Sequence, residues 1–185
     1  MCKYICSLLF FCLCYSLPAT ALPVESFASL PDVSQLKLSP SGEKISSVIR
    51  INAENTNGTA VQVTDLKSGK NKLVLFTDNK KYDIYWVSWK DEKTLLVGVM
   101  YPSKIDTWIN ISRVSGKTRA TQLMIIDLEQ DKIFTPFSSK FLKKYKITPV
   151  IQDAVVDILW DEPDHLLMAL PTNQSLAMGA RSFTG

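Results

Sequence analysis

The chain has 185 residues, with 21 basic and 18 acidic side chains and 46% hydrophobic residues. This length is typical of one ordinary domain or of a piece of a larger one. The nearly balanced charge excludes the broad basic surface with which nucleic-acid-binding domains neutralise phosphates.

The first 21 residues differ in kind from the rest. Lys3 is followed by an apolar run of 14 residues from Tyr4 to Leu17, and Ala19 and Ala21 supply small side chains after it. This pattern predicts a signal peptide over 1–21, with a helical apolar core and cleavage after Ala21. The run is shorter than the roughly 20 residues of a membrane-spanning helix, although an uncleaved N-terminal anchor is the alternative. We therefore expect a secreted or periplasmic protein with no stable membrane anchor after cleavage.

All four cysteines lie inside that segment, at Cys2, Cys6, Cys12 and Cys14. After cleavage the chain would carry no thiol, so it could form neither a disulfide nor a cysteine metal site. A thiol-free chain tolerates the oxidising compartments to which signal peptides lead.

Residues 22–33 read as a lead-in segment, and residues 34–77 as a first unit of four antiparallel strands. Two strands flank the turn Ser39-Pro40-Ser41-Gly42, where proline presets φ and glycine accepts a positive φ. The third and fourth strands are expected over Val61 to Leu66 and Leu73 to Phe76, joined by a turn at Ser68-Gly69.

A second unit over 82–137 repeats part of the first. AVQVTDLKSGK from Ala60 corresponds to QLMIIDLEQDK from Gln122, with Asp65 and Asp127 in matching places. Each copy is a strand that ends in Asp-Leu, turns and leads into a second apolar run. Internal repetition of this size is typical of blades that bury their faces against one another. Because an aspartate at a strand end can accept hydrogen bonds from turn amides, the repeat predicts a structural role for both aspartates.

The first strand of the second unit, around Tyr82 to Trp89, is apolar on both sides. Strict alternation places Tyr85, Val87 and Trp89 on one face and Ile84 and Trp86 on the other, as expected of a strand between two sheets. After a turn over Lys90 to Lys93, the other strands are expected over Leu95 to Val99, Leu123 to Leu128 and Ile133 to Phe137. The polar stretch 103–120 is read as an inserted interaction loop.

The third unit is incomplete. Residues 155–170 give two strands around a turn at Asp161 to Asp164, and the tail 171–185 shows no further alternation. The predicted fold class is therefore all-β: a partial β-propeller of about two and a half four-stranded antiparallel blades, preceded by the signal helix. An open set of blades leaves edges exposed, so self-association is expected.

The polar residues outside this repeat are assigned no chemistry. His165 is the only histidine and is read as a surface turn residue, and Asp161, Glu162 and Asp164 as turn formers. The run from Lys140 to Lys146 is read as a solvated strand or loop edge. We therefore predict no catalytic residue, no cofactor and no metal site.

Four tryptophans are candidate ligand platforms or core residues. Trp86, Trp89 and Trp160 lie in or at the end of the first strand of a unit and are assigned to inter-sheet packing, whereas Trp108 lies in the insertion and both roles stay open.

Several segments together resemble a known family: LPDVSQLKLSPSGEKIS, VTDLKSGK, RATQLMIIDLE and VVDILWDEPDHLLMAL. They are similar to the N-terminal β-propeller of secreted prolyl oligopeptidase-type serine peptidases, often labelled dipeptidyl aminopeptidase or acylaminoacyl peptidase-like. The resemblance covers roughly Val24 to Leu170, with Ser41 in place of the family's usual aspartate. It implies a propeller that gates and positions short peptides for a following α/β-hydrolase domain, which carries a Ser, Asp, His triad.

That hydrolase pattern is missing from these residues. An α/β-hydrolase presents its serine on a GxSxG turn, and no such motif occurs in the sequence. We therefore expect a noncatalytic propeller fragment of a serine peptidase, not an enzyme by itself, that meets peptide substrate only through a hydrolase domain absent from the sequence. A stand-alone periplasmic propeller that scaffolds protein contacts and a non-functional truncated gene product are the alternatives.

Overall fold

The computed structural model describes residues 32–53, 56–109, 112–147 and 150–172. All of them belong to one compact unit, Pro31–Gly185. The predicted signal peptide, nearly all of the lead-in segment and most of the tail lie outside the described residues. Within the described residues no helix is long and apolar enough to cross a membrane.

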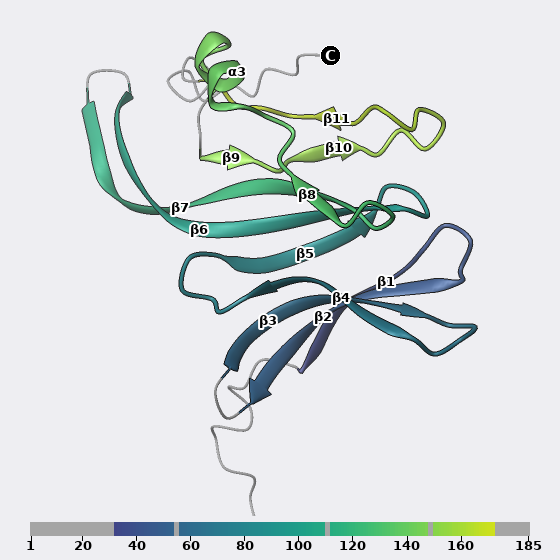
Figure 1. Ribbon diagram of the computed structural model, residues 1–185. Coiled ribbons are helices and arrows are strands. Elements are labelled where there is room, and N and C mark those ends of the chain that lie inside the picture. The colour runs from purple at the N-terminus through teal and green to yellow at the C-terminus, as the bar shows by residue number, and fades with distance from the viewer. Residues whose placement is uncertain (1–31, 54–55, 110–111, 148–149, 173–185) are drawn as a thin grey trace, which may run out of the picture. The chain divides into compact units, whose positions relative to one another are not determined.

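The first sheet is an antiparallel meander in the order of the chain. It contains β1 (Val33–Leu38), β2 (Lys44–Ala53), β3 (Thr56–Asp65) and β4 (Asn71–Thr77) (Figure 1). The predicted turn joins β1 to β2, where Gly42 has a φ of 74° and donates its N–H to the Ser39 carbonyl at 2.9 Å. The four antiparallel strands expected here are confirmed.

The second sheet continues the same path. It contains β5 (Asp83–Trp89), β6 (Thr94–Ile109), β7 (Ser112–Asp127) and β8 (Lys132–Phe134), again in chain order. A short fifth strand, β9 (Ile151–Gln152), pairs parallel with β7 at Thr121 and Gln122. This parallel strand was not predicted from the sequence.

The stretch 103–120 is not a loop. Strands β6 and β7 pair without interruption from Thr94↔Asp127 to Ile109↔Ser112, so the expected insertion is the distal part of one long hairpin (Figure 1). Its polar composition had argued against a core strand, but strands can pair outside a core, and most of the side chains that the structure describes in this stretch are exposed. Alternate backbone groups of this stretch pair across the hairpin, so it continues the two strands and does not form a loop.

The third unit is smaller than predicted. Strands β10 (Val155–Asp157) and β11 (Leu167–Met168) form a two-stranded antiparallel sheet. Before them lies the one helix that the structure describes, α3 (Ser139–Lys144), whose first turn is capped by the Ser138 hydroxyl. The basic run read as a strand or loop edge is therefore helical. It is solvent-exposed, as expected, except for the half-buried Leu142.

The core lies between the first and second sheets. Val48, Val61, Val63 and Leu75 face it from the first sheet, while Ile84, Val87, Trp89, Leu95, Val97, Val99 and Ile126 face it from the second. The indole Nε1 of Trp89 also donates to the Lys37 carbonyl in β1 at 2.9 Å, which ties the two sheets together. The chain is thus mostly antiparallel β structure, and its described sheets are open.

Candidate functional site

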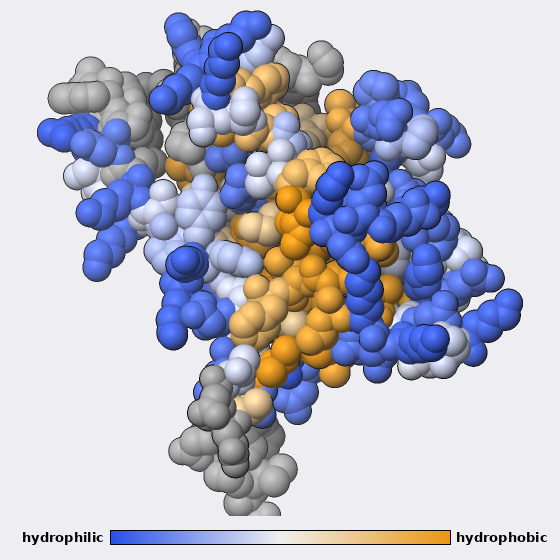
Figure 2. Space-filling view, in the orientation of Figure 1, coloured by the Kyte–Doolittle hydropathy of each residue, from blue (hydrophilic) through white to orange (hydrophobic). Residues whose placement is uncertain are grey.

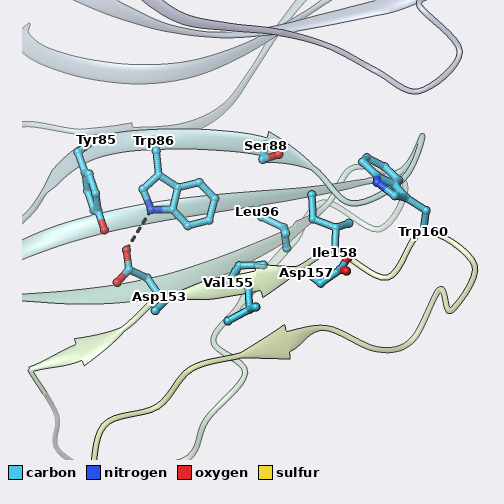
Figure 3. Close-up of a pocket in the computed structure, with 11 residues that line it drawn as sticks. Tyr85, Trp86, Ser88, Leu96, Asp153, Val155, Asp157, Ile158 and Trp160 are labelled. Atoms are coloured by element: carbon cyan, nitrogen blue, oxygen red, sulfur yellow. Dashed lines mark hydrogen bonds between the residues drawn. The ribbon is translucent and has the colours of Figure 1, made fainter. Parts of the chain in front are cut away.

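A cleft lies on the face of the second sheet that points away from the first. Its volume is about 780 Å³. One wall is made by β5 and β6 and the other by the segment 153–160, which leads into and out of β10 (Figure 3). The lining side chains are mixed: Tyr85, Trp86, Ser88, Leu96, Asp153, Ala154, Val155, Val156, Asp157, Ile158 and Trp160.

A β-bulge in β5 decides which side chains reach this cleft. Ile84 pairs with Val99 and Trp86 pairs with Gly98, so Tyr85 is an extra residue between two paired positions. The bulge puts Ile84 in the core with Val87 and Trp89, and places both Tyr85 and Trp86 beside the cleft. The face assignment from strict alternation was wrong for Ile84 and Tyr85, because a one-residue insertion reverses the side on which the preceding residues lie.

Trp86 packs flat on a glycine of the neighbouring strand. A Cβ atom at Gly98 would lie 1.9 Å from Nε1 of Trp86 and 2.3 Å from its Cδ1. In the first sheet, a Cβ atom at Gly58 would lie 2.1 Å from the Thr77 carbonyl oxygen and 2.8 Å from the Phe76 ring, so the backbone there sets the first limit. At Gly98 the missing side chain makes the space that the Trp86 ring fills.

The Trp86 indole is held in place by Asp153. Its Nε1 donates to Oδ2 of Asp153 at 3.0 Å, and the Thr121 hydroxyl donates to Oδ1 (Figure 3). Asp153 is only 7% exposed. Burial raises the pKa of the Asp153 carboxyl, because the apolar surroundings disfavour its charged form. Sequence reasoning did not single out Asp153, which stands between two short strands with no motif around it.

Lys90 fastens the other end of the segment. The residue is 4% exposed, and its ammonium donates to the carbonyls of Ile158, Leu159 and Glu162 at 2.5, 2.8 and 2.9 Å. An ammonium has three N–H donors, so all three are used. The turn after β10 therefore wraps around a buried cation. The sequence analysis placed Lys90 in a turn, and a lysine in the charged stretch 90–93 gives no signal of burial.

Trp160 corresponds to Trp89 by sequence but not by environment. LWDEPDHLL from Leu159 matches SWKDEKTLL from Ser88, and this match aligns the two tryptophans. Trp89 is 2% exposed in the core, whereas Trp160 is 58% exposed at the far end of the cleft (Figure 3). The prediction that Trp160 packs between sheets was wrong, because the two residues of β11 build too little sheet to cover it. Trp86 is half-buried, and the side chain of Trp108 lies outside the described residues.

The two repeated aspartates perform the predicted structural task. Oδ1 of Asp65 accepts hydrogen bonds from the N–H and the hydroxyl of Ser68, both at 2.7 Å. Oδ1 of Asp127 accepts from the N–H groups of Glu129 and Gln130, at 2.9 and 2.8 Å. The Ser68 N–H is the largest of the influences that lower the pKa of Asp65.

The residue after each aspartate repeats a second contact. Leu66 donates its N–H to the Glu43 carbonyl at 2.9 Å, and Leu128 donates to the Lys93 carbonyl at 2.8 Å. In both sheets this bond joins the end of the third strand to the turn between the first and second strands. The repeat in the sequence is therefore a repeat of hydrogen bonds.

The polar residues of the 161–165 turn lie in solvent. Asp161, Glu162, Asp164 and His165 are all exposed, and Nδ1 of His165 lies 3.5 Å from a Glu162 carboxylate oxygen. Ser88 is the serine that lines the cleft, and no histidine lines it. No group of three metal-ligating side chains occurs within the part of the chain that the structure describes. The cleft can therefore hold a ligand by contact, but it contains no serine–histidine pair for nucleophilic chemistry.

Comparisons with known proteins place few limits on this chain. No protein-family model matches the sequence, and no curated protein matches it significantly. A solved structure of the AtxE2 isopeptidase in its apo form is similar, with 15% identity and a TM-score of 0.38. The similarity covers 65% of this chain and 21% of the isopeptidase chain, so the chain spans about a fifth of that protein.

Proposed function

We propose that this chain is a noncatalytic β-propeller module of a secreted or periplasmic serine peptidase of the prolyl oligopeptidase type. Its role is to gate and position peptide substrates for a hydrolase domain that these residues do not contain. One observation carries the proposal: two four-strand meanders repeat each other down to the Asp65 and Asp127 turns and pack face to face.

Face-to-face packing of successive meanders is how propeller blades bury their surfaces. Here each sheet follows the other in chain order, and the apolar side chains of both interdigitate between them. The third unit begins to cover the far face of the second sheet, with β10 and β11 again antiparallel. This order supports blades over other all-β arrangements, because each unit contacts the next one in sequence.

The noncatalytic part of the proposal rests on the missing machinery. The sequence has no GxSxG motif, and its single histidine lies in an exposed turn. A fluorophosphonate probe reacts covalently with activated serine nucleophiles, so the full chain should remain unlabelled and should not hydrolyse chromogenic dipeptide substrates. Stoichiometric labelling would contradict a noncatalytic module.

Membership in a peptidase is tested at the gene. The DNA that follows codon 185, read in all frames, should encode a GxSxG motif within an α/β-hydrolase pattern. If no such pattern follows, the peptidase assignment is overturned, and a stand-alone propeller that scaffolds protein contacts becomes the better explanation.

A further inference from the structure

Helix α3 and the residues around it carry a concentrated positive charge. The stretch 137–147 contains four lysines and no acidic residue. The lysines are Lys140, Lys143, Lys144 and Lys146. All four are exposed, and none of them forms an ion pair with a carboxylate in the part of the chain that the structure describes. The stretch therefore presents four ammonium groups to the solvent without an internal counter-charge.

The end of the helix keeps one of these lysines in an unfavourable backbone conformation. Lys146 donates its N–H to the Lys143 carbonyl at 3.2 Å, and Ile147 donates to the Leu142 carbonyl at 2.9 Å. These two bonds form a Schellman motif, in which the left-handed position is usually glycine. Lys146 occupies that position with a φ of 53°, which costs energy for a residue with a Cβ atom. Local backbone preferences therefore do not explain why a lysine stands here.

The opposite side of the segment is fixed to the rest of the protein. Leu142 and Ile147 are half-buried, whereas the lysines around them are exposed. Ile147 also forms an isolated antiparallel bridge with Thr172, close to the end of the described chain. The helix is thus held by its apolar side and by its backbone, and it presents the charged side as one surface.

Aromatic rings lie among the lysines on that surface. Phe141 is 38% exposed and Tyr145 is 51% exposed, and their ring centroids lie 4.7 Å apart. The Lys144 ammonium lies 4.9 Å from the centre of the Tyr145 ring, a distance at which a cation and a ring attract. In Figure 2 hydrophilic residues project at the top of the view, where α3 lies in Figure 1, with hydrophobic residues beside them. We call this surface the basic–aromatic patch; it consists of Lys140, Phe141, Lys143, Lys144, Tyr145 and Lys146.

The composition of the patch favours a membrane surface over other anionic partners. An anionic bilayer offers phosphate groups to the lysines and, just below them, an apolar boundary to the aromatic rings. All four cations are lysines, which act as point charges and lack the planar fork with which arginine recognises one carboxylate or phosphate group. Nucleic acid requires a broader basic surface, whereas the remaining charges of this chain nearly cancel.

We propose that the basic–aromatic patch docks this protein on the surface of a bilayer that contains anionic phospholipids. The four ammonium groups lie at the level of the head-group phosphates, and the rings of Phe141 and Tyr145 enter the boundary beneath them. Each lysine near such a surface strengthens binding about fivefold, and salt weakens the attraction. The contact is peripheral and reversible, because the patch itself adds no membrane-spanning element.

The test measures how the full chain binds to two kinds of vesicle. One kind contains phosphatidylcholine alone, and the other contains equal parts of phosphatidylcholine and phosphatidylglycerol. In co-sedimentation the unchanged chain should bind the mixed vesicles roughly 100-fold more tightly, and high salt should remove this preference. The apolar run 4–17 is present in every variant and meets the same hydrocarbon in both kinds of vesicle, so the difference between them reports on charge.

Two double variants with the same change of charge locate the contact. Lys143→Gln combined with Lys144→Gln should weaken binding to the mixed vesicles roughly 25-fold, which is the effect of two lysines. Lys67→Gln combined with Lys70→Gln is the matched control. Lys67 and Lys70 are exposed in the turn between β3 and β4, so this variant should bind the mixed vesicles like the unchanged chain.

Two single variants separate a lost contact from a lost fold. Lys146→Gly places the favoured residue at the left-handed position, so its urea midpoint should stay equal or rise while binding to the mixed vesicles falls about fivefold. Phe141→Ala should weaken binding without altering its dependence on salt, because it removes a ring and no charge.

Several results would overturn the proposal. Equal binding of the unchanged chain to both kinds of vesicle would show that the patch does not respond to anionic lipid. Equal losses in the two double variants would show that the contact lies elsewhere, and undiminished binding of Lys146→Gly or Phe141→Ala would exclude the patch. Binding to poly-glutamate as tight as binding to the mixed vesicles would assign the patch to acidic proteins instead of a membrane.

Discussion

The two faces of the second sheet meet their neighbours in opposite ways. Toward the first sheet the contact is apolar and closed, with Trp89, Val97 and Leu95 buried in one core. Toward the third unit the contact is open, and polar groups make it: the Asp153 carboxylate at one end and the Lys90 ammonium at the other, with a cleft of about 780 Å³ between them. The second sheet therefore contacts the first sheet through buried apolar surface, whereas it contacts the third unit through hydrogen bonds of Asp153 and Lys90.

This difference teaches how much sheet a face-to-face contact between sheets requires. The contact between the first and second sheets has four strands on each side, which exclude water. There the hydrophobic effect stabilises the packing. The two short strands β10 and β11 do not cover the second sheet, so specific hydrogen bonds fix the segment at its ends. Removing one partner of such a hydrogen bond is costly, because the buried polar group that remains has neither a partner nor water.

The pair of equivalent tryptophans gives the largest expected contrast. Trp89→Ala should destabilise the full chain by about 3–5 kcal/mol, because it opens a cavity in the closed contact and removes the bond to the Lys37 carbonyl. Trp160→Ala should cost no more than about 0.5 kcal/mol, as for other exposed positions. Urea unfolding followed by circular dichroism measures both, and equal losses would show that the two contacts are alike.

Lys90→Met should act locally and less strongly. Methionine keeps the length of the side chain but leaves three carbonyls without their donor, which costs about 1–3 kcal/mol in the turn 158–162. Hydrogen exchange should accelerate at the N–H groups of Glu162 and His165, which close this turn. Amides of β6 in the core should keep their protection.

Lys93→Met serves as the control for Lys90. Lys93 lies in the same turn, but it is exposed, and its ammonium lies 2.9 Å from a Glu129 carboxylate oxygen. Its substitution should leave the exchange of residues 158–165 unchanged. If the two variants behaved identically, the buried ammonium would not be the tie that the geometry indicates.

Substitution of Asp153 should have the smallest effect on stability, and this effect should depend on pH. Because burial raises its pKa above the usual 3.8, the folded chain holds this proton more tightly than the unfolded chain does. The stabilisation is complete below about pH 3.8 and is lost as the pH rises through the folded pKa. Asp153→Asn, which keeps a hydrogen-bonding group beside Trp86 and Thr121, should flatten the dependence of the urea midpoint on pH in this window.

The exposed Asp157 is the comparison for this titration. It also lines the cleft, and its Oδ1 accepts the Leu159 N–H at 2.9 Å. Asp157→Asn should leave in place the fall in stability that Asp153 contributes. A profile that Asp153→Asn does not alter would mean that the Asp153 proton is held equally in the folded and unfolded chains.

Local chemistry made much of the fold predictable. The Ser39 to Gly42 turn, the alternating strands of the first sheet and the roles of Asp65 and Asp127 each depend on residues within a few positions of one another. Short stretches of sequence determine such features, because turn residues and the alternation of apolar side chains act between close neighbours in the chain.

Features that depend on distant partners were not predictable. Lys90 is buried because a turn about 70 residues later supplies the carbonyl groups that accept its hydrogen bonds. Asp153 has a recognisable role only because the fold brings Trp86 and Thr121 within hydrogen-bonding distance of its carboxyl group. The bulge at Tyr85 has no marker such as glycine, so strict alternation misassigned the face of Ile84. The length of the β6–β7 hairpin was missed because pairing between two polar strands leaves no apolar trace.

That hairpin has a dynamic consequence. Beyond the Met100↔Thr121 row, β6 and β7 have no third strand beside them among the described residues, and at about 3.3 Å per residue the stretch from Ser103 to Ile109 extends roughly 20 Å further. An ion pair joins the two strands near its end, between Arg113 and Asp106 at 2.7 Å. Opening must then proceed stepwise from the tip toward the sheet, so a molecule that grips the tip would slow exchange along the whole arm.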